Sequence, residues 1–122
     1  MDIRYSTGKE AFRHMTTEEL RKEFLVQNIF KADDVSAVYS HIDRIVTLGA
    51  MPVSGKLDLA KNIDPMKDFG VNYFLERREL GIINIGGDGV VVPPPVPGTI
   101  GGGGGVVVVV GGVVVVVVGV VV

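Results

Sequence analysis

The chain changes composition abruptly at Gly89. Residues 90–122 consist of 18 Val, 9 Gly, 4 Pro, one Thr and one Ile, whereas all 12 Lys and Arg and all 14 Asp and Glu residues precede them. A run of identical apolar residues fits a sheet equally well after a slip of one or two positions, because no polar side chain distinguishes the registers. The sequence therefore predicts a folded domain at residues 1–89 and a low-complexity Val/Gly/Pro tail, without a specified fold, at residues 90–122.

Charge and composition exclude several classes of partner. The net charge of −2 is spread without a basic stripe that could neutralise a run of phosphates, so nucleic acid is not an expected partner. The absence of cysteine excludes a disulfide framework and thiolate metal sites, and fits a reducing compartment. The first residues lack the apolar core of a secretory signal. We therefore expect a cytoplasmic protein.

The tail from Gly101 to Val122 is just long enough to span a membrane. It has no flanking basic residues or interfacial aromatic side chains, and valine with glycine favours a strand over a helix. A membrane partner is therefore not expected.

The first part of the domain predicts one short amino-terminal helix. Thr16 stands three residues before Glu19, which is the spacing of a capping box. Leu20 and Phe24 lie one helical turn apart and give the segment an apolar stripe. We expect this helix to run from Thr17 to Val26.

The rest of the domain has the pattern of extended segments separated by turns. β-Branched and aromatic residues alternate through residues 35–46, which is typical of a strand. Proline and glycine predict a bend at residues 49–55 and a loop at residues 62–70. The glycines at 86–89 predict a hairpin turn. The expected strands are residues 35–46, 57–59, 73–76, 80–85 and 90–92, which makes the domain mainly β and mostly antiparallel.

Two pairs of side chains are candidates for substrate binding. His41 and Asp43 are two residues apart on an expected strand and would point the same way, so the carboxylate could orient the imidazole as a general base. The alternative is that both are polar partners within a strand or a subunit interface.

The second pair is Arg77 and Arg78, whose guanidinium groups match the geometry of a substrate carboxylate. The alternative is a salt-bridged bend, because Glu76 and Glu79 stand beside them in the sequence.

A metal site is not expected in this chain. A catalytic zinc needs about three nitrogen or oxygen ligands that converge on one open site. The chain has two histidines, His14 and His41, and they are separated by an expected helix and strand. Neither an HxH pair nor an HExxH motif is present.

Two long blocks, YSHIDRI at residues 39–45 and YFLERRELGIINIGG at residues 73–87, resemble the amino-terminal part of the 5-keto-4-deoxyuronate isomerase family. Shorter matches are EFLV at residues 23–26 and Met51-Pro52. The resemblance covers residues 1–89 and stops there.

The resemblance implies a two-domain cupin, in which each half is a β-barrel or jelly roll, assembled as a homohexamer. It implies isomerisation of a keto-uronate from pectin degradation, with a zinc ion held by three histidines and a glutamate in the carboxy-terminal half. Residues 79–89 resemble the strand and glycine turn that close a first cupin motif, but Asn72, Tyr73 and Phe74 stand where metal-bearing cupins have histidines. The resemblance thus implies a metal-free, cupin-like partial barrel.

Two functions follow as hypotheses. By resemblance, the chain is a ketol-isomerase of uronate catabolism that lacks the zinc-binding half and is inactive as written. The alternative is a non-catalytic cupin-like module that builds a homo-oligomer.

Overall fold

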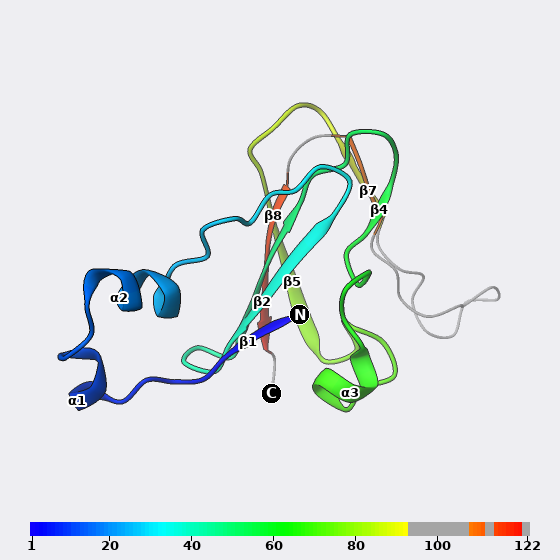
Figure 1. Cartoon of the computed structure of the whole chain (residues 1–122). Helices are drawn as coiled ribbons and strands as arrows, with labels where there is room; N and C mark the ends of the chain where they lie inside the picture. The colour runs from blue at the N-terminus through cyan, green and yellow to red at the C-terminus, as the bar shows by residue number, and fades with distance from the viewer. Residues whose placement is uncertain (93–107, 112–113, 121–122) are drawn as a thin grey trace.

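The computed structural model describes residues 1–92, 108–111 and 114–120, which form a mostly β structure with a few short helices (Figure 1). A five-stranded mixed sheet has the order β1-β2-β3-β8-β5, and a three-stranded antiparallel sheet has the order β4-β7-β6. The predicted mainly β class is confirmed at this level. The strands are β1 (Asp2–Arg4), β2 (Val35–Ser40), β3 (Ile45–Ala50), β4 (Leu57–Asp58), β5 (Arg78–Asn84), β6 (Val90–Val92), β7 (Val108–Val110) and β8 (Val114–Val120).

The β2–β3 hairpin is the centre of the larger sheet. Its register pairs Val35 with Ala50 and Ser40 with Ile45. The prediction of one strand through residues 35–46 is wrong, because residues 41–44 form a turn in which Arg44 has a φ of 54°. The predicted bend at residues 49–55 begins too early, since β3 continues to Ala50.

One hydrophobic core joins the two sheets. Alternate residues of β2 and β3 point into it, as the two-residue period of a strand requires, and β4 and the following loop cover the other side. The buried members are Val35, Ala37, Val46, Leu48, Ala50, Leu57, Leu59, Ile63 and Phe74.

The described residues form three short helices where the sequence predicts one. They are α1 (Lys9–Phe12), α2 (Thr17–Phe24) and α3 (Pro65–Phe69). In α2 the predicted capping box between Thr16 and Glu19 is confirmed, and the helix ends two residues earlier than expected.

Helix α3 occupies the segment predicted as a loop, and the residues behind that prediction are its caps. The Asp64 side chain accepts a hydrogen bond from the backbone N–H of Lys67, and Pro65 occupies the first helical turn. Gly70 ends the helix with a left-handed φ of 65°. Turn residues and helix caps use the same residue types, which explains the wrong prediction.

The glycine turn at residues 86–89 does not make the predicted hairpin. β5 pairs with β8 in the larger sheet, whereas β6 pairs with β7 in the smaller one. The predicted strand at residues 73–76 is also wrong, because residues 74–77 form turns before β5 begins at Arg78.

The tail contributes three strands in its described parts, β6, β7 and β8, although the sequence predicts no specified fold there. β8 lies between β3 and β5 and is antiparallel to both, and β7 lies between β4 and β6. The remainder of the segment from Gly101 to Val122, which has the length of a membrane span, lies outside the described residues. Within the residues that are described, no helix is long and apolar enough to cross a membrane.

The first 34 residues contain no buried side chain; the first buried residue of the chain is Val35. Helices α1 and α2 lie to one side of the larger sheet (Figure 1). Arg4 ties this amino-terminal arm together, since its Nη1 donates to the carbonyl oxygens of Glu23 and Leu25 at 3.1 Å each.

Candidate functional site

A row of aromatic rings crosses the end of the larger sheet where β2 ends and β5 begins. Tyr5 stacks on His41 at 4.7 Å between ring centroids, and His41 meets Tyr39 edge to face at 4.8 Å. Tyr39 then meets Phe69 at 5.7 Å, and Phe69 packs against Phe74 at 6.0 Å. Edge-to-face and stacked pairs of this kind stabilise each other by about 0.5–1.5 kcal/mol. We call these five side chains the aromatic row.

Arg78 packs on Phe69, which lies between Tyr39 and Phe74 in the aromatic row. Its guanidinium carbon is 3.8 Å from the centroid of the Phe69 ring, a cation–π contact. Its Nη1 is buried and has no hydrogen-bond partner in the part of the chain that the structure describes. Burial lowers the pKa of Arg78 from its ordinary value, and the nearby Tyr39 opposes this shift. The side chain remains a cation at neutral pH because the ordinary pKa is so high.

The salt-bridged bend predicted around Arg77 and Arg78 is not formed within the described residues. The Glu76 carboxylate accepts instead from the backbone N–H of Asn72 at 2.6 Å and from its side-chain amide at 3.5 Å. Glu79 is exposed, on the opposite face of β5 from the half-buried Arg78. Arg77 is exposed too. The ion pairs among the described residues are Arg4–Asp2, Arg13–Glu10 and Lys61–Asp34.

His41 and Asp43 lie in the turn between β2 and β3, so the strand alternation used to align them does not apply. Both are exposed, and no hydrogen bond joins them. His41 belongs to the aromatic row. Asp43 makes no ring contact but lines a cavity of about 360 Å³, whose lining also includes Phe24 and Tyr5, the outer member of the aromatic row. The structure therefore places His41 and Arg78 on one row of contacts, and leaves Asp43 and Arg77 outside it.

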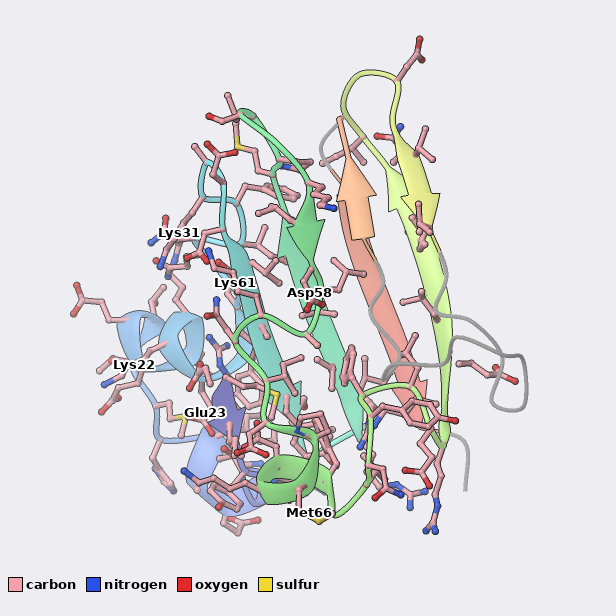
Figure 2. All side chains as sticks on the ribbon, turned by 90° about the vertical axis from the view of Figure 1, so that its right-hand side faces the viewer. Lys22, Glu23, Lys31, Asp58, Lys61 and Met66 are labelled. Atoms are coloured by element: carbon pink, nitrogen blue, oxygen red, sulfur yellow. The ribbon has the colours of Figure 1, made fainter. Side chains whose placement is uncertain are left out.

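A larger cavity of about 870 Å³ opens between α2 and the strands β1 and β2. Arg21, Lys22 and Lys31 line it, and Figure 2 shows Lys22 and Lys31 on the same side of the molecule. All three side chains are exposed, and Glu18 lines the same cavity. It is a polar groove under the amino-terminal arm rather than a desolvated binding site.

Asp33 has a structural role that the sequence does not reveal. Its carboxylate accepts from the backbone N–H groups of Val53 and Ser54 at 2.8 and 2.7 Å, and from the Ser54 hydroxyl at 2.7 Å. These hydrogen bonds, with that from Ser54 first, lower the pKa of Asp33. Asp33 also has a left-handed φ of 54°, which aspartate tolerates better than most residues. In the sequence Asp33 and Asp34 form no motif and predict only solvated turn residues, so no sequence signal marks this set of hydrogen bonds, which we call the Asp33 clasp.

The zinc ion that the family resemblance implies does not fit the residues present. No group of three or more His, Cys, Asp or Glu side chains in the described ranges could hold a metal ion. His14 follows α1, and His41 is committed to ring contacts in the aromatic row. The remaining residues, 90–122, contain no nitrogen, sulfur or carboxylate side chain.

The chain is similar to curated enzymes over most of its length, although no family model matches it. A 4-deoxy-L-threo-5-hexosulose-uronate ketol-isomerase of Pectobacterium carotovorum is 52% identical over 92 residues, which is 75% of this chain and 32% of the relative. The Salmonella newport enzyme of the same name is 48% identical over 92 residues, with the same shares of each chain. The 4-deoxy-L-threo-5-hexosulose-uronate ketol-isomerase 2 of Enterococcus faecalis is 48% identical over 91 residues, again 75% of this chain and 32% of the relative.

The chain spans about a third of the length of these curated relatives. These matches confirm the family resemblance that the two sequence blocks indicate. They also confirm that the resemblance is to the amino-terminal part of the relatives. Over its matched residues, the chain is homologous to the amino-terminal part of the 4-deoxy-L-threo-5-hexosulose-uronate ketol-isomerases.

Proposed function

We propose that the chain corresponds to the amino-terminal part of a uronate ketol-isomerase and does not catalyse the isomerisation alone. One observation carries this proposal. Over 92 residues the chain is 52% identical to an enzyme, and those residues make up 32% of the length of that enzyme. In this proposal the zinc-binding, catalytic domain lies in the two thirds of the relatives that the chain does not match. The described domain is a cupin-like partial barrel, for which two sheets around one core are a suitable frame.

The side chains present support the inactive assignment. A ketol-isomerase must move a proton between adjacent carbons while the neighbouring oxygens are polarised. Of the candidates for a base, His41 is packed between two tyrosine rings and Asp43 is exposed and not hydrogen-bonded to it. No set of converging ligands accompanies them in the described residues. The chain is therefore expected to bind no zinc by itself and to need, for catalysis, the part of the relatives that it does not match.

An assay with the keto-uronate tests this proposal. The purified chain is incubated with substrate in the presence and absence of zinc, and the intact Pectobacterium carotovorum relative serves as the positive control. We expect turnover by the relative and no turnover by the chain above its metal-free control. Zinc-dependent turnover by the chain would show that its active site is complete.

A second candidate function is a non-catalytic module that builds a homo-oligomer. It is favoured by the amino-terminal arm, in which none of the first 34 residues is buried. Within it, Phe12, Phe24 and Leu25 are 42–48% exposed, which suits an interface with another polypeptide. Size-exclusion chromatography with light scattering would report an oligomer if the arm binds a second copy. A monomer at all concentrations would contradict this module.

The substrate class, the cellular location and the partners rest on the names of the relatives and on the composition of the chain. A uronate is the proposed substrate class of the complete protein, because the relatives are named for it. A cytoplasmic location and the absence of nucleic-acid and membrane partners stay predictions from composition.

A further inference from the structure

The tail supplies an inner strand of each sheet. β8 lies between β3 and β5, and β7 lies between β4 and β6. Within the described ranges β5 pairs with β8 and with no other strand, and β6 pairs with β7 and with no other strand. β5 is therefore hydrogen-bonded into the larger sheet through a strand of the tail. We call the place between β3 and β5 the β8 position.

The pairing of β8 does not distinguish one copy of the chain from another. β8 pairs with Val46 to Ala50 of β3 and with Arg78 to Asn84 of β5. The ladder hydrogen bonds come from backbone groups, which every extended segment offers. Each residue of β8 is Val except Gly119, and strands with a weakly specified register are prone to domain swapping. A second copy therefore offers the β8 position an equivalent strand.

The connection between β7 and β8 is short and rich in glycine. Only Gly111, Gly112 and Val113 separate the two strands, although the strands belong to different sheets. Gly111 has a left-handed φ of 68°, and a Cβ there would lie 2.9 Å from the carbonyl oxygen of Asp88. Glycine adopts left-handed and extended backbone with similar ease, so Gly111 can also open the connection. Short hinge loops between two elements favour domain swapping.

We propose that β8 exchanges between two copies of this chain, so that the β8 position of each copy receives residues 114–120 of the other. The exchange is reciprocal, because a chain that gives up its β8 leaves its own β8 position open. The exchanged strand makes the same pairings as a strand from the same chain, so no hydrogen bond of the ladder is lost. The exchange requires neither the proposed kinship to isomerases nor the amino-terminal arm.

Disulfide formation between two singly substituted full-length chains tests the exchange. Thr47 of β3 pairs with Val117 of β8, and the chain has no cysteine of its own. Chains with Thr47→Cys and chains with Val117→Cys are mixed in urea, refolded together and oxidised. The control replaces the second chain with Val53→Cys, because Val53 is 64% exposed and reports random collisions. We expect at least tenfold more mixed dimer with Val117→Cys than with Val53→Cys.

A hinge variant shifts the balance between the closed and the exchanged chain. Gly111→Ala disfavours the left-handed backbone of the closed connection, whereas an extended connection accepts alanine. Gly55→Ala is the matched control, because a Cβ there meets nothing within 4 Å. Light scattering over a range of concentrations measures the dimer. We expect Gly111→Ala to lower the dimer dissociation constant at least fivefold and Gly55→Ala to keep it within twofold of the parent.

Two results would overturn the exchange. One is mixed disulfide with Val117→Cys at the level of the Val53→Cys control, since β8 then stays in its own chain; this measurement needs no hinge variant to fold. The other is an unchanged dissociation constant in folded Gly111→Ala. A dimer seen by light scattering without the mixed disulfide would assign the association to the arm and would also count against the exchange. Neither measurement involves isomerisation, so failure of the exchange and failure of the proposed function are separately visible.

Discussion

Single residues define the ends of elements and the contacts between loops. The Thr16 hydroxyl accepts from the backbone N–H of Glu19 at 3.3 Å, and the Glu19 carboxylate accepts from the backbone N–H of Thr16 at 2.7 Å. Asp33 performs a comparable task between two distant segments, through three hydrogen bonds to residues 53 and 54. Such contacts are local and can be removed one at a time.

Substitution of Thr16 with alanine should fray α2 without unfolding the domain. An N-cap hydroxyl contributes roughly 1 kcal/mol, and α2 has no buried residue through which the loss could reach the core. Amide hydrogen exchange in the last turn of α2 should accelerate about fivefold, as expected for that free energy. The control is Thr17→Ala, which lies inside the helix. Equal acceleration in both variants would contradict the capping role.

The Asp33 clasp should make stability depend on pH in the acid range. Its pKa is lowered in the folded chain, so its contribution is complete above the unfolded pKa of about 3.9 and is lost as pH falls through the folded pKa. Urea unfolding of the parent and of Asp33→Asn should therefore differ at neutral pH and converge in acid. Asp43→Asn, in an exposed turn, is the control. A difference that persists unchanged in acid would exclude the clasp.

At the scale of elements, the sequence predicts helix α2 and the strand character of β2 and β5 because each carries a local pattern, such as the capping box of Thr16. The sequence does not predict the features that depend on contacts between residues far apart in the chain. The turn at residues 41–44 and the separation of β5 from β6 depend on which strand pairs with which. Helix α3 is missed because Asp64 and Gly70 serve turns and caps alike.

The candidate site is predicted only in part, for the same reason. The guanidinium of Arg78 and the imidazole of His41 are visible as chemistry in the sequence. Their joint placement depends on Tyr39 and Phe69, which reach the same end of the sheet from β2 and α3. No spacing of residues along the chain predicts that these side chains come together.

Gly49 in β3 should tolerate no side chain. A Cβ atom at this position would collide with the carbonyl group of Ile29, so Gly49→Ala should lower the free energy of unfolding by about 1–3 kcal/mol. Gly55→Ala is the matched control, because a Cβ there meets nothing within 4 Å. Urea unfolding measures both variants. Equal stability of the two would contradict the close approach of Ile29 to β3.

Strand β8 should occupy more than one register between β3 and β5, because Val114–Val118 are identical. The structure pairs Thr47 with Val117. The chain has no cysteine, so Thr47→Cys combined separately with cysteine at Val117, Val116 or Val115 reports each register by disulfide formation. We expect cross-links at all three positions. A cross-link confined to Val117 would show that a single register is specified after all.

At the scale of the whole molecule, the chain combines a family-specific amino-terminal part with a tail of valine and glycine. The matched stretch is about a third of each relative, and the side chains needed to hold zinc do not assemble within the described residues. The exposed arm of the first 34 residues is consistent with a surface that a larger protein would cover. We propose that this chain supplies the structural amino-terminal part of a ketol-isomerase.

A chimera measures that claim most directly. The amino-terminal third of the Pectobacterium carotovorum relative is replaced by the homologous stretch of this chain, and keto-uronate isomerisation is assayed with zinc. We predict that the folded chimera is active while the chain alone is inactive under the same conditions. A folded but inactive chimera, or activity in the isolated chain, would contradict the account.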